Sequence, residues 1–311
     1  MRVLFMGTPD FAAECLKAVY NKDGVTVVGA VSQPDKPKGR GMKMIPTPVK
    51  EFAESVGIPV YQPVTLKDDA FLDELKALDP ELIIVAAYGK LLPSYVLDYP
   101  KYGCVNAHGS LLPKYRGAAP IQRALIDGEP VTGITAMYMA EGLDTGDMIL
   151  KLTTPITDED DFGTLHDRLA ILGGEAMCAV IDCINSGTVP REVQNDEEAT
   201  YAAKILKEDT MVDFSRPAGE IFNMIRGLSP VPLAVTHTPD GKLLKLTSAK
   251  KTDVKSEAVP GTVVSLEGGA ITVACGEGCI AITGVVPEGK SRMGADAYIN
   301  GRKIAVGDIL K

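Results

Sequence analysis

Apolar runs of strand length alternate with stretches of helical periodicity through the first third of the chain. The runs lie at 2–6, 25–31, 58–61, 81–86 and 103–108, and helical patterns separate them at 11–20, 47–56 and 68–78. Strands that alternate with helices form βαβ units and a mainly parallel sheet. We therefore predict a Rossmann-like α/β sheet, which continues with a helix over 116–126, strands over 133–139 and 147–155, and a long helix over 162–184.

The sequence pattern changes after residue 186. A polar segment without periodicity is followed by a helical stretch over 217–227 and then by short strand patterns at regular spacing, at 231–237, 243–249, 259–265, 270–275 and 278–285. Such a rhythm is typical of a small β-barrel, OB-like in size. For a chain of 311 residues two domains are the usual solution. We expect an α/β domain over 1–186, a linker over 187–205 and an OB-like domain over 206–311.

Composition favours an ordinary globular protein, with 45% hydrophobic and 23% charged residues. We find no apolar run of the roughly 18–20 residues that a membrane span needs, and the opening MRVLFMGTPDF lacks the features of a signal peptide. The six cysteines are scattered, and Cys275 and Cys279 have no second pair or histidine at zinc spacing. We expect a cytoplasmic protein with reduced thiols, no metal, no membrane and no obligate protein partner.

The turn after the first strand, Gly7-Thr-Pro-Asp-Phe11, lacks the second and third glycines of a dinucleotide fingerprint. A dinucleotide site is therefore not expected. Two interpretations of the turn remain. It is a tight turn at Gly7, or it lines a substrate pocket beyond the carboxyl ends of the strands.

A basic loop over 33–46 follows the second strand. It carries Lys36, Lys38, Arg40 and Lys43 against the single acid Asp35. The net charge of −9 argues weakly against a nucleic-acid partner, but screening allows a local basic patch to bind phosphates on an acidic protein. The loop is either a solvated mobile segment or a basic flap that meets a phosphate backbone.

Candidate catalytic groups gather around the fifth strand. Asn106 and His108 alternate on it, so both side chains leave the same face at the carboxyl end. Asn106 can donate a hydrogen bond to a developing oxyanion, and His108 can do the same or carry a proton. Asp144 lies in a glycine-flanked loop, where a carboxylate can orient the imidazole. Asp147 is a competing carboxylate that we expect to be structural.

No activated nucleophile is evident. Ser110 lacks the G-x-S-x-G elbow, and Cys104 lies within an apolar strand. His166 and His237 have the positions of packed or solvated histidines. The groups at 106–144 therefore suit direct transfer between two bound substrates, without a covalent enzyme intermediate.

Several motifs give the chain a close resemblance to the folate-dependent formyltransferases. The central ones are Asn106-Ala-His108-Gly-Ser-Leu-Leu-Pro113, Tyr115-Arg-Gly-Ala-Ala-Pro-Ile-Gln122 and Gly142-Leu-Asp-Thr-Gly-Asp147. Segments outside them also fit, including Gln33-Pro-Asp35, Gly39-Arg-Gly41, Arg226-Gly-Leu-Ser-Pro230 and Pro287-Glu-Gly-Lys290. Val231 departs from the pattern, since the family usually has Trp there, and Gly109 stands where Ala or Pro is usual.

The resemblance implies a donor, an acceptor and a set of site residues. The donor is 10-formyltetrahydrofolate, and the acceptor is the free amine of initiator methionyl-tRNA. Asn106, His108 and Asp144 form the implied catalytic set. The implied folate site consists of Ser110, Leu111, Leu112 and Pro113, to which we add Tyr88 and Gly89. The 33–46 loop with Arg40, Lys38 and Lys43 meets the acceptor end of the tRNA, and the OB-like domain holds its body.

Two alternatives remain at this point. A formyltransferase with the same catalytic domain could act on glycinamide ribonucleotide or on the amine of a sugar nucleotide. A catalytically idle RNA-binding protein could also be built on this fold. The basic loop and the second domain argue against the first alternative, and the presence of Asn106, His108 and Asp144 argues against the second.

Overall fold

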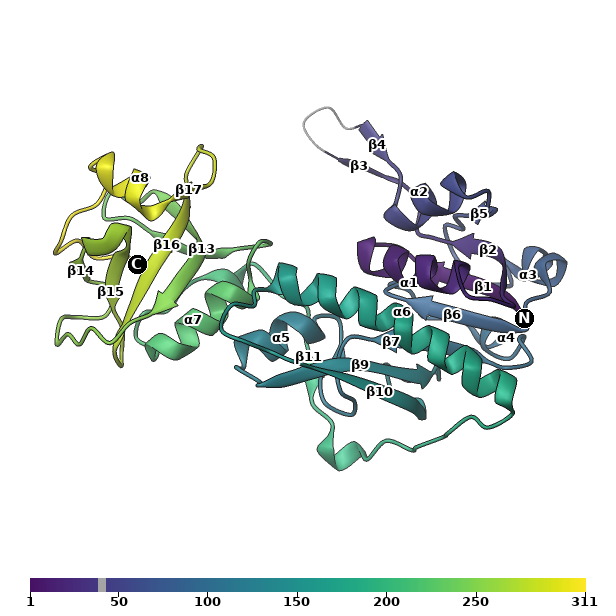
Figure 1. Ribbon diagram of the computed structural model, residues 1–311. Helices are drawn as coiled ribbons and strands as arrows, with labels where there is room; N and C mark the ends of the chain where they lie inside the picture. The colour runs from purple at the N-terminus through teal and green to yellow at the C-terminus, as the bar shows by residue number, and fades with distance from the viewer. Residues whose placement is uncertain (39–42) are drawn as a thin grey trace. The chain divides into compact units, whose positions relative to one another are not determined.

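The computed structural model describes residues 1–38 and 43–311 and divides the chain into two units, each taken by itself below (Figure 1). The first unit comprises residues 1–117, 131–154 and 166–202. Its seven-stranded sheet has the order β10-β9-β7-β6-β1-β2-β5. The strands are β1 (Arg2–Gly7), β2 (Thr26–Val31), β5 (Val60–Tyr61), β6 (Leu82–Ala86), β7 (Cys104–His108), β9 (Val131–Tyr138) and β10 (Met148–Pro155). The pairs from β5 through β7 are parallel and β7 with β9 is antiparallel, which confirms the predicted mainly parallel sheet.

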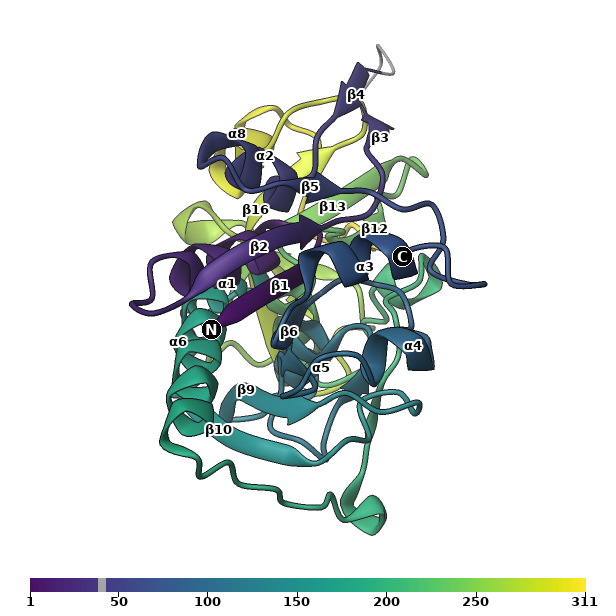
Figure 2. The same cartoon turned by 90° about the vertical axis from the view of Figure 1, so that its right-hand side faces the viewer.

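Helices cover both faces of this sheet (Figure 2). Leu4 and Met6 of β1 point into a core shared with α3 (Leu72–Leu78) and α4 (Ser94–Leu97). The opposite face is covered by α1 (Asp10–Tyr20) and α6 (Phe162–Ser186), which lie side by side. A Cβ on Gly174 of α6 would stand only 2.6 Å from the Cβ of Ala18 in α1, so a larger residue would push the helices apart. Helix packing on both faces explains why the strands read as continuous apolar runs.

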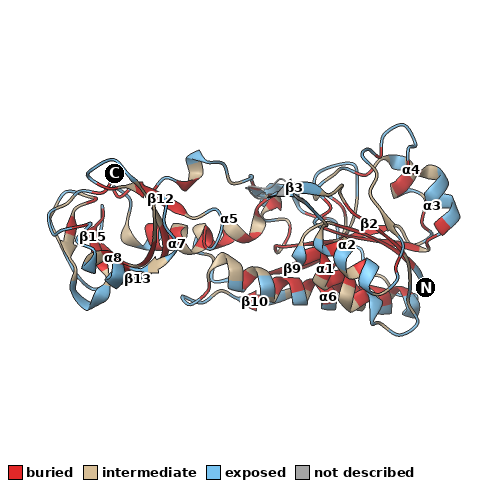
Figure 3. Ribbon diagram, turned by 90° about the horizontal axis from the view of Figure 1, so that it is seen from above, coloured by how far each residue is buried: buried red, intermediate tan, exposed pale blue. Residues whose placement is uncertain are grey.

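Helix α6 meets the length and composition of a membrane span, contrary to our expectation that no run does. Half of its most apolar stretch is buried within the protein, and Figure 3 shows α6 with both buried and exposed positions. Leu165, Leu169 and Val180 are fully buried. This burial is typical of a core helix, which has the same composition because it is enclosed by protein rather than lipid.

Gly7 is required by packing at the end of β1. A Cβ there would lie 2.6 Å from the Cβ of Ala12 and 2.8 Å from the carbonyl oxygen of Ala86. Only glycine lets α1 start this close to the sheet. Gly7 thus serves close packing, and the next residue, Thr8, lines a hollow with Gln33 and Lys36.

The basic loop is more ordered than its sequence suggests. It contains a hairpin of β3 (Lys36–Lys38) and β4 (Lys43–Ile45), in which Lys36 pairs with Ile45 and Lys38 with Lys43. The sequence did not predict these two strands. Arg40 lies outside the described residues. Thr47 then caps α2 (Pro48–Ser55), since its hydroxyl accepts a hydrogen bond from the Lys50 amide.

The second unit comprises residues 118–130, 155–165 and 203–311. Its antiparallel sheet has the order β12-β13-β16-β15-β14, with β17 also paired to β16. The bounds are β12 (Ala234–His237), β13 (Leu243–Lys251), β14 (Val263–Ser265), β15 (Ile271–Ala274), β16 (Cys279–Pro287) and β17 (Met293–Gly294), with helices α5 (Pro120–Ile126), α7 (Ala218–Gly227) and α8 (Ala295–Asn300). Register shifts between Leu246 and Ala249 mark bulges, which bend a sheet toward closure. The predicted OB-like β-domain is confirmed.

Candidate functional site

The site is built at the carboxyl edge of the first unit's sheet, around β7. Asn106 pairs in parallel register with Val85 of β6, and His108 follows two residues later. His108 is buried, with 5% of its surface exposed, while Asn106 is half-buried. No hydrogen bond to the Asn106 amide occurs among residues 1–38 and 43–311, so its N–H groups are free for a substrate oxygen.

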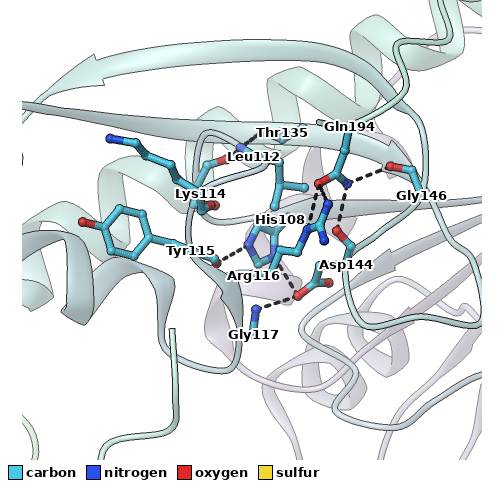
Figure 4. A network of polar contacts seen from close by, with 11 residues as sticks. His108, Leu112, Lys114, Tyr115, Arg116, Gly117, Thr135, Asp144, Gly146 and Gln194 are labelled. Atoms are coloured by element: carbon cyan, nitrogen blue, oxygen red, sulfur yellow. Dashed lines mark hydrogen bonds and ion pairs between the residues drawn. The ribbon is translucent and has the colours of Figure 1, made fainter. Parts of the chain in front are cut away.

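The His108 ring lies between two acceptors (Figure 4). Its Nε2 is 2.9 Å from the carbonyl oxygen of Tyr115, and its Nδ1 is 3.6 Å from Oδ2 of Asp144. A carbonyl oxygen can only accept a hydrogen bond, so Nε2 carries a proton and donates a hydrogen bond to the Tyr115 carbonyl oxygen. When Nδ1 also carries a proton, as in the imidazolium form, it points this proton at the Asp144 carboxylate, and that contact orients the ring. A substrate oxyanion would therefore compete with the Tyr115 carbonyl for the Nε2 proton, a rearrangement that ligand-free sites commonly require.

Asp144 is fixed by the backbone around it. It adopts a left-handed conformation, with φ at 53°, in the loop between β9 and β10. Its Oδ2 accepts a hydrogen bond of 2.8 Å from the amide of Gly117, and a Cβ on Gly117 would stand 2.8 Å from the Ala202 carbonyl oxygen. The competing carboxylate, Asp147, instead has Arg191 at 3.8 Å. Of the two carboxylates, the structure thus brings Asp144 to the histidine.

Gln194 and Arg116 support the Asp144 loop, and sequence reasoning missed both. The amide of Gln194 donates to the carbonyl oxygens of Asp144 and Gly146, each at 2.8 Å. Its oxygen accepts from Nε and Nη2 of Arg116, at 3.0 and 2.8 Å. Both side chains are buried, and Figure 4 shows these contacts. Gln194 lies in the polar segment that we expected to be a linker, and no local pattern marks it. Arg116 stands in the Tyr115–Gln122 motif, the one available signal.

The Ser-Leu-Leu-Pro turn is stabilised by hydrogen bonds from its own residues. The Ser110 hydroxyl donates to the Lys114 carbonyl oxygen at 2.7 Å, and the Leu112 amide donates to the Thr135 hydroxyl at 3.0 Å. Ser110 and Leu112 are buried, and Leu112 packs in a small core with two methionines. Leu111 and Pro113 are half-buried. The side chains that the turn offers to a donor are therefore those of Leu111 and Pro113, rather than those of all four expected residues.

Tyr88 and Gly89 differ from the expected folate contacts. The Tyr88 side chain is 2% exposed and packs in the core, where burial raises the pKa of its hydroxyl to about 12. Any contact of Tyr88 with a donor would have to come from its backbone. Gly89 has φ at 78°, and a Cβ there would lie 2.7 Å from Nε2 of Gln33. The close approach that its glycine suggested is thus to a side chain of this protein.

Neither an activated nucleophile nor a metal site was expected from the sequence. Burial raises the pKa of the Cys104 thiol to about 12, which opposes formation of the nucleophilic thiolate. All six cysteines are free thiols. Within the described parts of the chain, no group of three or more His, Cys, Asp or Glu side chains could hold a metal ion.

A free amide donor beside a carboxylate-held imidazole, at the edge of a Rossmann-like sheet, suits group transfer through a tetrahedral oxyanion. These features define an α/β transferase. The chain belongs to the formyl transferase family, which matches residues 1–181, and the family's C-terminal domain matches residues 204–303.

Similar proteins extend over the whole chain. The methionyl-tRNA formyltransferase of Marinobacter nauticus is 48% identical and covers 97% of each chain, and that of Caldanaerobacter subterraneus is 48% identical and covers 100% of each. Among solved structures, HypX from Aquifex aeolicus in complex with tetrahydrofolic acid has a TM-score of 0.64 at 18% identity, over 97% of this chain and 47% of that one. A Helicobacter canadensis N-formyltransferase also has a TM-score of 0.64 at 18% identity, over 90% and 97%. These two structures share the fold.

Proposed function

We propose that this chain transfers the formyl group of 10-formyltetrahydrofolate to the free amino group of initiator methionyl-tRNA, for translation initiation. The observation that carries the proposal is the 48% identity to methionyl-tRNA formyltransferases over 97–100% of the chain. Both the catalytic and the C-terminal formyl transferase domains are matched. We propose a cytoplasmic location, and we retain 1–186, 187–205 and 206–311 as the proposed domains and linker.

The proposed reaction is direct transfer between the two bound substrates. The methionyl nitrogen bonds to the formyl carbon, and the bond from that carbon to N10 of the folate then breaks. The proton that the amine loses ends on the released N10. The Asn106 amide, with no partner of its own among the described residues, donates to the oxyanion, and His108 joins it when its Nε2 proton leaves the Tyr115 carbonyl. Asp144, 3.6 Å from Nδ1, orients the ring and assists proton removal.

The substrates would be held by different parts of the first unit. Leu111 and Pro113 offer apolar surface to the folate, and the backbone of Tyr88 and Gly89 lies at the neighbouring strand end. Lys38, Arg40 and Lys43 of the basic loop would contact the acceptor end of the tRNA. Basic side chains suit this role because they attract the phosphate backbone.

The test is transfer of labelled formyl from 10-formyltetrahydrofolate to methionyl-tRNA, compared with transfer to glycinamide ribonucleotide and to a sugar-nucleotide amine. We expect transfer to methionyl-tRNA alone, with Arg40→Ala losing tRNA-dependent rate while folate binding stays intact. Preferred transfer to either small amine would show a different acceptor. Binding of tRNA without any folate-dependent turnover would show an idle RNA-binding protein.

A further inference from the structure

The segment that follows β6 has an exposed and strained backbone. Ala87 and Gly89 are exposed, with φ at 44° and 78°. The left-handed region is unfavourable for alanine because of its Cβ, so surrounding contacts must hold this residue in place. Val85 of β6 pairs with Asn106 of β7, and adjacent strands are about 4.8 Å apart. The Ala87–Gly89 segment therefore borders the strand that carries the candidate catalytic amide.

Two side chains from neighbouring strand ends hold this segment through one carbonyl group. Gln33, beyond the end of β2, donates through Nε2 to the Tyr88 carbonyl oxygen at 2.8 Å. The hydroxyl of Thr8, beyond the end of β1, donates to the same oxygen at 3.3 Å. A Cβ on Gly89 would lie 2.7 Å from the Gln33 nitrogen, so glycine leaves room for this contact. The conformation of the Ala87–Gly89 segment thus depends on Gln33.

Gln33 is also joined to the base of the basic hairpin. Its carbonyl oxygen accepts from Nε2 of Gln62 at 2.9 Å, and the same nitrogen donates to Oδ1 of Asp35 at 2.7 Å. Lys50 completes the cluster, with Nζ at 2.7 Å from Oδ2 of Asp35 and at 2.9 Å from Oε1 of Gln62. Asp35 precedes β3, and Lys50 lies in α2, which follows β4. Both ends of the hairpin are therefore connected to the main chain of Gln33.

A second link joins the same two parts of the first unit. The Nζ of Lys90 donates to the carbonyl oxygens of Pro63 and Val64, at 3.1 and 2.8 Å. These two residues directly follow Gln62, which bonds to the hairpin base. Hydrogen bonds weaken steeply away from their preferred geometry. A shift of the hairpin base therefore changes the contacts that hold the Tyr88 carbonyl group.

We propose that Gln33 is a positioning residue that couples the binding of the two substrates. Acceptor binding at the hairpin fixes Gln33, and Gln33 then fixes the Ala87–Gly89 segment for the folate donor. The donor binds without the entropic cost of ordering that segment, so its affinity rises. Linkage makes the effect reciprocal, because the donor must strengthen acceptor binding by the same factor. The inference rests on the proposed function, since it concerns both substrates of that reaction.

The experiment measures the Kd of 5-formyltetrahydrofolate for the 311-residue protein, alone and with saturating methionyl-tRNA. This folate carries its formyl group on N5 rather than N10, so binding is measured without transfer. We expect methionyl-tRNA to lower the Kd at least about fivefold, the lower end of typical coupling factors. The readout is the coupling ratio, which is the Kd without tRNA divided by the Kd with tRNA. A merely structural role of Gln33 would change both Kd values equally and leave this ratio unchanged.

Gln33→Met keeps the length of the side chain but removes the donor to Tyr88, so the coupling ratio should fall close to one. Gln62→Met removes contacts to the hairpin base and leaves the bond between Gln33 and Tyr88, and it should also lower the ratio. Lys36→Met is the control, because Lys36 is an exposed residue of β3. Loss of its charge should weaken tRNA binding without changing the ratio. Urea unfolding shows whether each variant is folded.

A coupling ratio of one in the wild type would overturn the proposal, and so would a wild-type ratio in folded Gln33→Met protein. If Gln33→Met does not fold, a wild-type ratio in Gln62→Met overturns it instead. In each case methionyl-tRNA would still accept formyl from 10-formyltetrahydrofolate, so the proposed function would stand. Failure of methionyl-tRNA to accept formyl from the wild-type protein would remove both.

Discussion

Gln194 offers a sharp test of how the candidate site is held, because its amide group has two separable tasks. Its nitrogen donates to the carbonyl oxygens of Asp144 and Gly146, and its oxygen accepts from Arg116. Gln194→Ala removes both sets of hydrogen bonds. Gln194→Glu keeps acceptors for Arg116 but turns a second oxygen toward the two carbonyls, which then lose their donor and face a negative charge.

The expected magnitudes follow from the bonds that each variant loses. The two amide–carbonyl bonds contribute about 1 kcal/mol each, and the bonds to the buried guanidinium about 1.5–3 kcal/mol together. Arg116 keeps its hydrogen bond to Asp196, at 2.7 Å. We expect Gln194→Ala to lower the free energy of unfolding by about 3–5 kcal/mol, and Gln194→Glu by about 2 kcal/mol. Both should lower kcat by roughly 10–100-fold, because small displacements of positioning groups have effects of that size.

The assays are urea unfolding and single-turnover formyl transfer on the same preparations, well below the unfolding midpoint. Asn195→Ala serves as control, because Asn195 is the exposed neighbour and does not contact the Asp144 loop. A folded Gln194→Glu protein with the wild-type single-turnover rate would refute the reasoning, since the loop would then hold Asp144 without the amide. Equal loss of stability in Ala and Glu variants would refute the division of tasks.

Three further predictions concern other parts of the first unit. Asn106→Ala should lower the single-turnover rate about 10²–10³-fold with folate binding retained, as measured by rapid quench and equilibrium binding, because it removes an oxyanion donor. Leu112→Ala should lower the free energy of unfolding by about 2–5 kcal/mol in chemical denaturation, and Leu111→Ala by much less, because only Leu112 is fully buried. Hydrogen bonds from Lys50 lower the pKa of Asp35, and the same pair raises the pKa of Lys50. The stability difference between wild type and Asp35→Asn should therefore be constant between about pH 4 and 10, and in urea titrations it should shrink as pH falls below or rises above that window.

The sequence predicted the α/β elements well because their signal is local. The strand patterns at 2–6, 81–86 and 103–108 became β1, β6 and β7 with shifts of one residue. The hairpin at the base of the basic loop was missed because its strands are three residues long and read Lys-Pro-Lys and Lys-Met-Ile, without the alternation that marks a strand.

The predicted helix over 116–126 begins only at Pro120, and the reason is non-local. Arg116 and Gly117 form β8 (Arg116–Gly117), which pairs with β11 (Tyr201–Ala202) from a distant part of the chain. That pairing holds the Gly117 amide where it binds Asp144. No pattern within the segment predicts this strand pairing, because the partner strand is more than 80 residues away in sequence.

The sequence by itself determined the sheet, the order of its strands along the chain and the placement of Asn106 and His108 at a carboxyl strand end. Those properties depend on side-chain periodicity over a few residues. Tertiary structure decided which carboxylate reaches the histidine, which nitrogen of the ring is engaged, and that Gln194 holds the Asp144 loop. It also decided that Thr8, Gln33 and the hairpin enclose a hollow. Each of these depends on contacts between segments far apart in sequence, and such contacts form only when the sheet brings its strand ends to one edge.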